Sequence, residues 1–280
     1  MKKNILILLL LFSSAFALDY SQYCTTKSPK KTFSGVIMST SGLNFLTKNI
    51  IEFEISKKLK KELSSDFQVH IDNFYGVNIL NGIFQGLNVK CKRINFNNFY
   101  VSNIEAQTLC KYNRIAYSNN EIKFKENMIL KYTSEITQND FNSTINSTQY
   151  KKILDKMNND ERISKLFKIN SSDIEIKNNK IVLKYTVYPL PRIFSLNNFI
   201  KPVKLSINSS LTVKDGQIQF DNPILNTGIK YVPHSIINLL NPINYTFDAT
   251  KTKKGKLTVE NVNIKNNKIY IEGYVIFLKD

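Results

Sequence analysis

The chain of 280 residues has only two histidines and three cysteines, residue types that are frequent in active sites and metal sites. Its two histidines, His70 and His234, lie far apart, and no carboxylate or cysteine stands near either at the spacing of a metal site. No Gly-x-Ser-x-Gly, His-Glu-x-x-His or phosphate-binding glycine loop occurs. The sequence therefore predicts no catalytic residue, no metal site and no cofactor.

Long apolar segments are also scarce, and the one at the N-terminus is too short to cross a membrane. Two lysines precede apolar residues 5–12, and the small residues Ala15 and Ala17 form a small-x-small cleavage site. This run falls well short of the ~20 residues that span a bilayer. We expect residues 1–17 to be a signal peptide rather than an uncleaved anchor, and the mature protein to be exported to the periplasm or cell envelope.

Acidic residues are in the minority, with 22 Asp and Glu against 39 Lys and Arg, a net charge of +17. Such a charge favours anionic partners, among them phospholipid headgroups, acidic polymers and nucleic acid. Export and the lack of an Arg-rich or recognition-helix pattern argue against nucleic acid. Because lysine is frequent along the whole chain, a composition bias accounts for the charge as well as a binding patch does.

Cysteine is limited to three residues, Cys24, Cys91 and Cys110. An oxidising compartment permits a disulfide, and Cys91 and Cys110 lie on segments that are expected to pair as strands. A bridge between these two and its absence are equally compatible with the sequence. If it forms, Cys24 is the unpaired thiol, on a loose N-terminal arm.

The sequence does contain one long helical segment. Residues 18–41 are polar, lack a sustained period and are predicted to be an arm or linker. Residues 42–63 follow helical spacing in two apolar rows that do not coincide, Leu46-Ile50-Phe53 and Ile51-Ile55-Leu59. An apolar stripe that turns around the axis suits a helix wrapped by a twisted sheet, and it also occurs in ordinary core helices.

Alternating apolar and polar residues dominate the rest of the chain and predict antiparallel strands. Residues that tolerate positive φ mark the hairpin turns, namely Asn97-Asn98, Asn178-Asn179, Asp215-Gly216 and Asn266-Asn267. A helix capped by Thr137 or Asn139 is expected in the middle of the chain. Further short helices are expected at residues 149–157, 161–167 and 234–240. The fold class is therefore α+β, with residues 42–280 forming a single domain.

The order of these segments resembles the LmeA-type phospholipid-binding proteins, which are exported bacterial envelope proteins. The similarity covers roughly residues 43–279 and includes residues 80–89 (LNGIFQGLNV), 134–142 (SEITQNDFN) and 225–233 (LNTGIKYVP). The resemblance implies a tubular lipid-binding fold, in which a strongly curved antiparallel sheet wraps a long N-terminal helix and leaves an apolar channel for acyl chains. It carries over no catalytic residue.

We therefore expect a non-enzymatic protein that holds or carries phospholipid or a related acylated molecule, with transient contact to a membrane surface. Candidate channel residues are apolar and lie on the long helix, the segment after the first strand and the late helix, namely Leu46, Ile50, Phe53, Val77, Leu80, Phe84, Ile236, Ile237 and Leu240. Candidate headgroup ligands are Lys57, Lys58, Lys60 and Lys61. The same apolar residues would also fill an ordinary core. The second hypothesis is therefore a structural or interaction module of the envelope without a channel.

Overall fold

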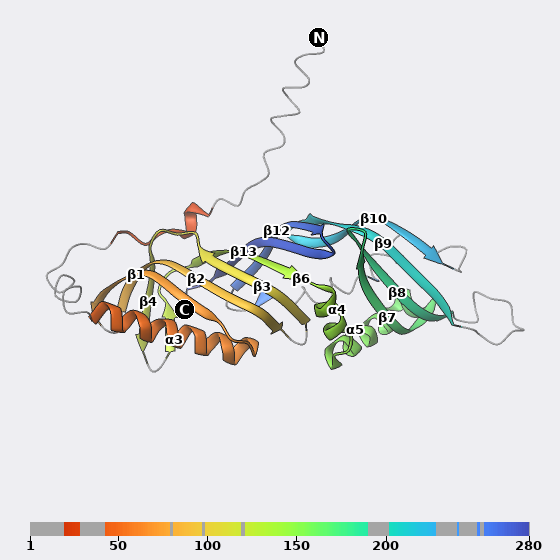
Figure 1. Cartoon of the computed structure of the whole chain (residues 1–280), viewed down its shortest axis with the longest axis horizontal. Helices are drawn as coiled ribbons and strands as arrows, with labels where there is room; N and C mark the ends of the chain where they lie inside the picture. Colours follow the sequence, from red (N-terminus) through yellow and green to blue (C-terminus); the bar gives the residue numbers. More distant parts are fainter. Residues whose placement is uncertain are drawn as a thin grey trace, which may run out of the picture.

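The computed structural model describes most of the chain (Figure 1), namely residues 20–28, 43–78, 81–96, 99–118, 121–189, 202–227, 240, 251–252 and 255–279. Residues 1–17, the expected signal peptide, lie outside the described residues. Of the expected polar arm, the structure describes residues 20–28, which include a short 3-10 helix η1 (Ser21–Tyr23). The described chain has a mixed α+β fold with mostly antiparallel strands.

The predicted long helix is confirmed as α3 (Leu43–Leu63). One of its two apolar rows packs inward, because Ile51 and Ile55 are buried in a cluster with residues of β1 (Gln68–Asn78) and β2 (Asn81–Phe96). The helix lies mainly along β1, with smaller contacts to β2 and β5 (Glu121–Phe124).

Two polar contacts hold α3 in register on β1. The Ile71 backbone N–H donates to the Glu52 carboxylate at 2.6 Å, and the Ser56 hydroxyl donates to the Phe67 carbonyl at 2.7 Å. Among the described strands β1 pairs with β2 alone. The helix therefore satisfies main-chain groups on the side of β1 that has no partner strand, which protects that sheet edge.

The larger sheet has nine strands among the described residues, in the order β11-β12-β13-β6-β3-β2-β4-β5, with β1 on the other side of β2. The remaining bounds are β3 (Phe99–Thr108), β4 (Asn113–Ser118), β6 (Met128–Ile136), β11 (Lys251–Thr252), β12 (Gly255–Lys265) and β13 (Lys268–Phe277). On one side β2 pairs with two strands in succession, since residues 81–84 pair with β4 and residues 88–96 with β3. The Leu87 N–H, between these ladders, donates to the Thr108 hydroxyl at 3.0 Å.

The smaller sheet is an antiparallel meander that lies beside the larger one (Figure 1). Its strands are β7 (Phe167–Lys177), β8 (Lys180–Pro189), β9 (Val203–Lys214) and β10 (Gln217–Thr227). Three short helices precede it, α4 (Gln138–Ile145), α5 (Thr148–Asn159) and α6 (Glu161–Ser164). Helix α4 contacts both β3 and β7, and β12 contacts β9, so the two sheets meet along one core.

Several local predictions are confirmed. Positive φ angles occur at the three described turns that were predicted from sequence, at Asn178-Asn179, Asp215-Gly216 and Asn266-Asn267. Thr137 caps α4 through a capping box with Asp140. The Asn97-Asn98 turn and residues 234–239 of the late helix lie outside the described residues. The helix expected at 161–167 is shorter than predicted, since β7 begins at Phe167.

Of the two alternatives left open by the sequence, the Cys91–Cys110 bridge does not form, because the bond joins Cys24 to Cys110 and Cys91 is a buried free thiol. In the β2–β3 ladder Cys91 lies opposite Ile104. Cys110 is six residues further along, roughly 20 Å at about 3.3 Å per residue, whereas bridged cysteines have Cα atoms within about 7 Å. Burial raises the pKa of the Cys91 thiol, so this thiol is protonated and unreactive at neutral pH.

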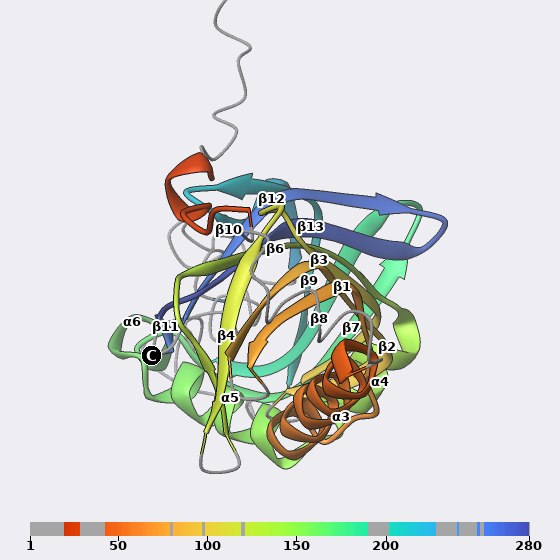
Figure 2. The same ribbon diagram turned by 90° about the vertical axis from the view of Figure 1, so that its left-hand side faces the viewer.

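The disulfide fixes residues 20–28 on the larger sheet, which corrects the expectation of a loose arm there. Tyr23 and Cys24 pack with the buried residues Ile129, Tyr274 and Ile276. The hydroxyls of Thr25 and Thr26 both donate to the Glu126 carboxylate. This segment lies on the opposite side of the molecule from α3 (Figures 1 and 2).

We predict that Cys24→Ser lowers the free energy of unfolding by about 4 kcal/mol, because the bond closes a loop with a sequence separation of 86. Denaturant unfolding of the oxidised protein measures the change, with Cys91→Ala as the control that keeps the bond. Non-reducing peptide mapping should recover Cys24 linked to Cys110. A Cys91–Cys110 peptide would contradict the structure.

Candidate functional site

Helix α3 has an apolar row on each of its two sides, and its outward side is the first candidate site. We define the α3 outer face as Phe45, Leu46, Ile50, Phe53, Lys57, Lys60 and Lys61. The row at Thr47, Ile51 and Ile55, spaced four residues apart, is buried against the larger sheet. Since a helix presents only one side to a sheet, the second apolar row points away from it.

The apolar half of the α3 outer face is strongly exposed. The exposed fractions are 64% for Phe45, 57% for Leu46, 52% for Ile50 and 65% for Phe53. The other large apolar side chains that are exposed in the described part of the chain lie singly on other elements. Single exposed apolar residues are ordinary, but several gathered on one helix mark an interaction surface.

Lysines make up the C-terminal half of the same face. Lys57 lies 3.9 Å from Glu54, and Lys60 lies 2.6 Å from Asp66. Both are exposed ion pairs, which contribute little to stability. Lys61 is also exposed, and Lys58 beside it is half-buried. The helix therefore presents an apolar surface followed by a cationic one.

Those candidate channel residues that the structure describes do not come together around one interior space. Leu46, Ile50 and Phe53 are exposed rather than enclosed, which corrects their assignment to a channel wall. Phe84 is fully buried in the cluster under α3, whereas Leu240 is buried in the separate cluster of the second sheet. Leu80, Ile236, Ile237 and the side chain of Val77 lie outside the described residues.

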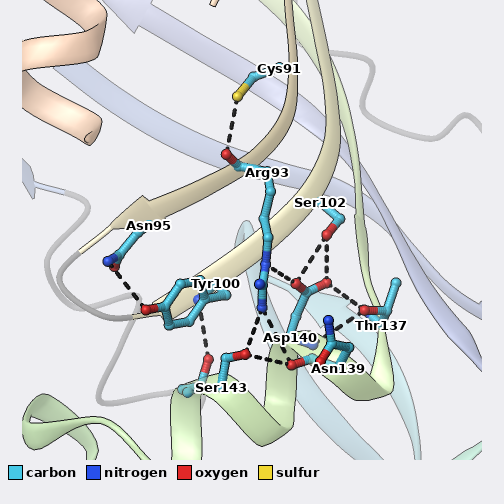
Figure 3. A network of polar contacts seen from close by, with 10 residues as sticks. Cys91, Arg93, Asn95, Tyr100, Ser102, Thr137, Asn139, Asp140 and Ser143 are labelled. Atoms are coloured by element: carbon cyan, nitrogen blue, oxygen red, sulfur yellow. Dashed lines mark hydrogen bonds and ion pairs between the residues drawn. The ribbon is translucent and has the colours of Figure 1, made fainter. Parts of the chain in front are cut away.

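A polar network between β2, β3 and α4 is the second candidate site (Figure 3). The almost fully buried Asp140 carboxylate accepts from Arg93 Nε at 2.7 Å and from the Ser102 hydroxyl at 2.8 Å. The Thr137 hydroxyl and backbone N–H also donate to it, at 2.7 and 2.9 Å. Arg93 lies over the Tyr100 ring, 4.4 Å from its centroid.

This network is a structural junction rather than a reactive site. Four donors fill the acceptor sites of the Asp140 carboxylate, and all of them belong to the fold itself. The contacts attach α4, which leads to the second sheet, to the strands of the first sheet. Sequence reasoning identified Thr137 as a cap but missed Arg93, because nothing local to residue 93 indicates a partner 47 positions away.

His70, the histidine that the structure describes, gives no further site. His70 is exposed, with Nδ1 3.5 Å from Glu52 and Nε2 3.8 Å from Asp72. His234 lies outside the described residues. In the part of the chain that the structure describes, no group of three or more His, Cys, Asp or Glu side chains is placed to hold a metal ion. None of the described helices is both long and apolar enough to cross a membrane.

The Tyr132 hydroxyl is the one buried side-chain polar atom in the described residues without a hydrogen-bond partner. It lies beside Gly273 of β13, where a Cβ would be 3.0 Å from the hydroxyl and 2.1 Å from the Thr258 carbonyl oxygen. Burial raises the pKa of Tyr132 well above the usual tyrosine value, so the phenol is neutral at all physiological pH values.

Comparison with family models, with curated proteins and with solved structures finds no match to this chain. The candidate sites therefore rest on the chain's own residues. Of these, the α3 outer face could have been recognised from the two non-coincident apolar rows, since one helix cannot bury both against a single sheet.

We predict that Asp140→Ala lowers the free energy of unfolding by about 2–4 kcal/mol, because it removes the capping box of α4 and the buried acceptor of Arg93, Ser102 and Thr137. The matched control is Asp155→Ala, which removes an exposed carboxylate of α5 and should change stability by less than about 0.5 kcal/mol. Equal effects of the two substitutions in thermal and denaturant unfolding would contradict the structural role of the network.

We predict that Tyr132→Phe is neutral or raises stability by about 1 kcal/mol, because an unpaired buried hydroxyl is unfavourable. The control Tyr150→Phe should destabilise by a similar amount, since Ser172 donates to the buried Tyr150 hydroxyl at 2.8 Å. Thermal unfolding of both variants measures the difference. A destabilised Tyr132→Phe protein would show that this hydroxyl has a partner in solution.

Proposed function

We propose that the protein is an exported, non-enzymatic lipid-binding protein, which holds or carries phospholipid or a related acylated molecule in the cell envelope. The observation that carries the proposal is the α3 outer face. Four large apolar side chains are more than half exposed there, and lysines follow them on the same helix. This pairing of surfaces matches the two ends of a phospholipid, an apolar chain and an anionic phosphate.

The energetics favour lipid on such a surface. Burying apolar surface stabilises a complex by about 0.8 kcal/mol per methylene group. An ammonium group beside a phosphate adds a charge-assisted hydrogen bond. In water the exposed apolar residues of α3 lack the first contribution and its lysines lack the second. Association with lipid therefore lowers the free energy of this face.

The disulfide supports export. Bonds such as Cys24–Cys110 form and persist in oxidising compartments and are rare in the cytosol. The signal-peptide pattern of residues 1–17 and the bond at Cys24, close behind the expected cleavage site, agree with each other. We therefore propose the periplasm or cell envelope as the location.

The resemblance to LmeA-type tubular lipid-binding proteins implies a strongly curved sheet around the long helix, with lipid between the two. Ile51, Ile55 and Phe84 occupy the space between α3 and the sheet. A lipid between helix and sheet would have to displace these side chains. The outer face is free for lipid without such rearrangement.

The second candidate function is a structural or interaction module of the envelope. The filled cluster under α3 favours it, since Phe84 and Ile71 there are fully buried by other side chains. In that case the outer face of α3 would bind a protein and not a lipid.

The two functions differ in what the purified protein carries and moves. We predict that organic-solvent extraction of the exported protein releases co-purified lipid, and that the protein accelerates transfer of a labelled phospholipid between vesicles. Protein unfolded by heat before the transfer assay serves as the control. An empty extract together with no transfer would exclude the lipid-binding function and favour the interaction module.

A further inference from the structure

We infer that the α3 outer face docks onto the surface of an anionic phospholipid bilayer, with the helix axis in the interface and its apolar N-terminal half deeper than its lysines. This inference rests on the proposed function and deepens it, because it names the lipid class, the surface and the orientation. Interfacial helices have this composition, with apolar and cationic surfaces on one amphipathic helix.

The position of α3 leaves its outer face accessible to a flat surface. The helix lies along the outside of the larger sheet, beside β1 (Figures 1 and 2). Glu52 and Ser56 bond to the main chain of β1 and of the residue before it, on the inward side. The helix is therefore held rigidly while Phe45, Leu46, Ile50 and Phe53 stay exposed.

The charges favour anionic headgroups. From residue 57 to 62 the helix has four lysines and one acidic residue, Glu62. The acidic groups Glu54 and Asp66 pair with Lys57 and Lys60, and Lys61 lies exposed on the same face. Each lysine near an anionic membrane adds about fivefold to binding at physiological ionic strength.

A second copy of the chain fits this face less well than a bilayer. The apolar row from Leu46 to Phe53 covers about one heptad, whereas a coiled coil sustains its apolar pattern over three to four heptads. Parallel pairing would place the lysines of two helices against each other, and antiparallel pairing would place lysines against the apolar half. Both arrangements oppose like charges or bury unpaired ones.

Because the chain has no tryptophan, a single introduced tryptophan reports directly on docking. We predict that Phe45→Trp and Phe53→Trp fluorescence shifts to the blue on vesicles of phosphatidylglycerol and phosphatidylcholine, and is quenched by brominated acyl chains. The matched control is Ile224→Trp on β10, an equally exposed apolar position on another element, whose emission should not change.

The charge part of the inference is tested in the same vesicles. Lys57→Gln with Lys61→Gln, two exposed lysines of the α3 outer face, should weaken binding about 25-fold. Lys151→Gln with Lys152→Gln, which removes two exposed lysines of α5, should leave binding within about twofold. Added salt should weaken wild-type binding by screening.

The outcomes separate this inference from the proposed function. Co-purified lipid and vesicle transfer without any change in Phe45→Trp or Phe53→Trp emission would overturn the docking face and keep lipid binding. Equal binding to vesicles of pure phosphatidylcholine would overturn the anionic preference. A dimer in analytical ultracentrifugation, with Phe53→Trp emission already blue-shifted in solution, would assign the face to a second copy. No lipid in any assay would remove both proposals.

Discussion

The packing of one side of α3 against β1 is the contact on which the arrangement of this protein's surfaces depends. Ile51 and Ile55 are buried in the cluster with Ile71 and Phe84, and Glu52 and Ser56 fix the helix along the strand. A 21-residue helix held by one side must present its other side to solvent. Since this helix has apolar residues on both sides, burial of one row forces exposure of the other.

The sequence predicted the features that depend on neighbouring residues. The spacing in residues 42–63 and the Asn-Asn and Asp-Gly turns gave α3 and three hairpins, because helical period and positive φ are local properties. Which row of α3 faces the sheet is not local, so Leu46, Ile50 and Phe53 were assigned to the interior. The pairing of the cysteines could not be predicted for the same reason, since it depends on where Cys24 lies relative to the end of β3.

Contacts between residues far apart in the sequence hold together the two sheets, on one of which α3 packs. The Arg93–Asp140 pair attaches α4 to the first sheet, and β12 and β13 return from beyond the second sheet to pair beside β6. The Cys24–Cys110 bond fixes residues 20–28 on the side away from α3 (Figure 2). These contacts join residues from 47 (Arg93 and Asp140) to 149 (Met128 and Phe277) positions apart, and so no pattern within one element indicates them.

The two apolar rows of α3 also determine where on the protein a lipid would bind. A channel requires apolar side chains around a space, but the inner row of α3 is already covered by Phe74, Phe84 and the strands beneath. The outer row has the exposed surface, and the lysines continue it. Lipid contact through the outer row leaves the folded core unchanged, whereas contact through the inner row would expose the core residues that hold α3 in place. The proposal of lipid binding therefore moves from the interior of the fold to its surface.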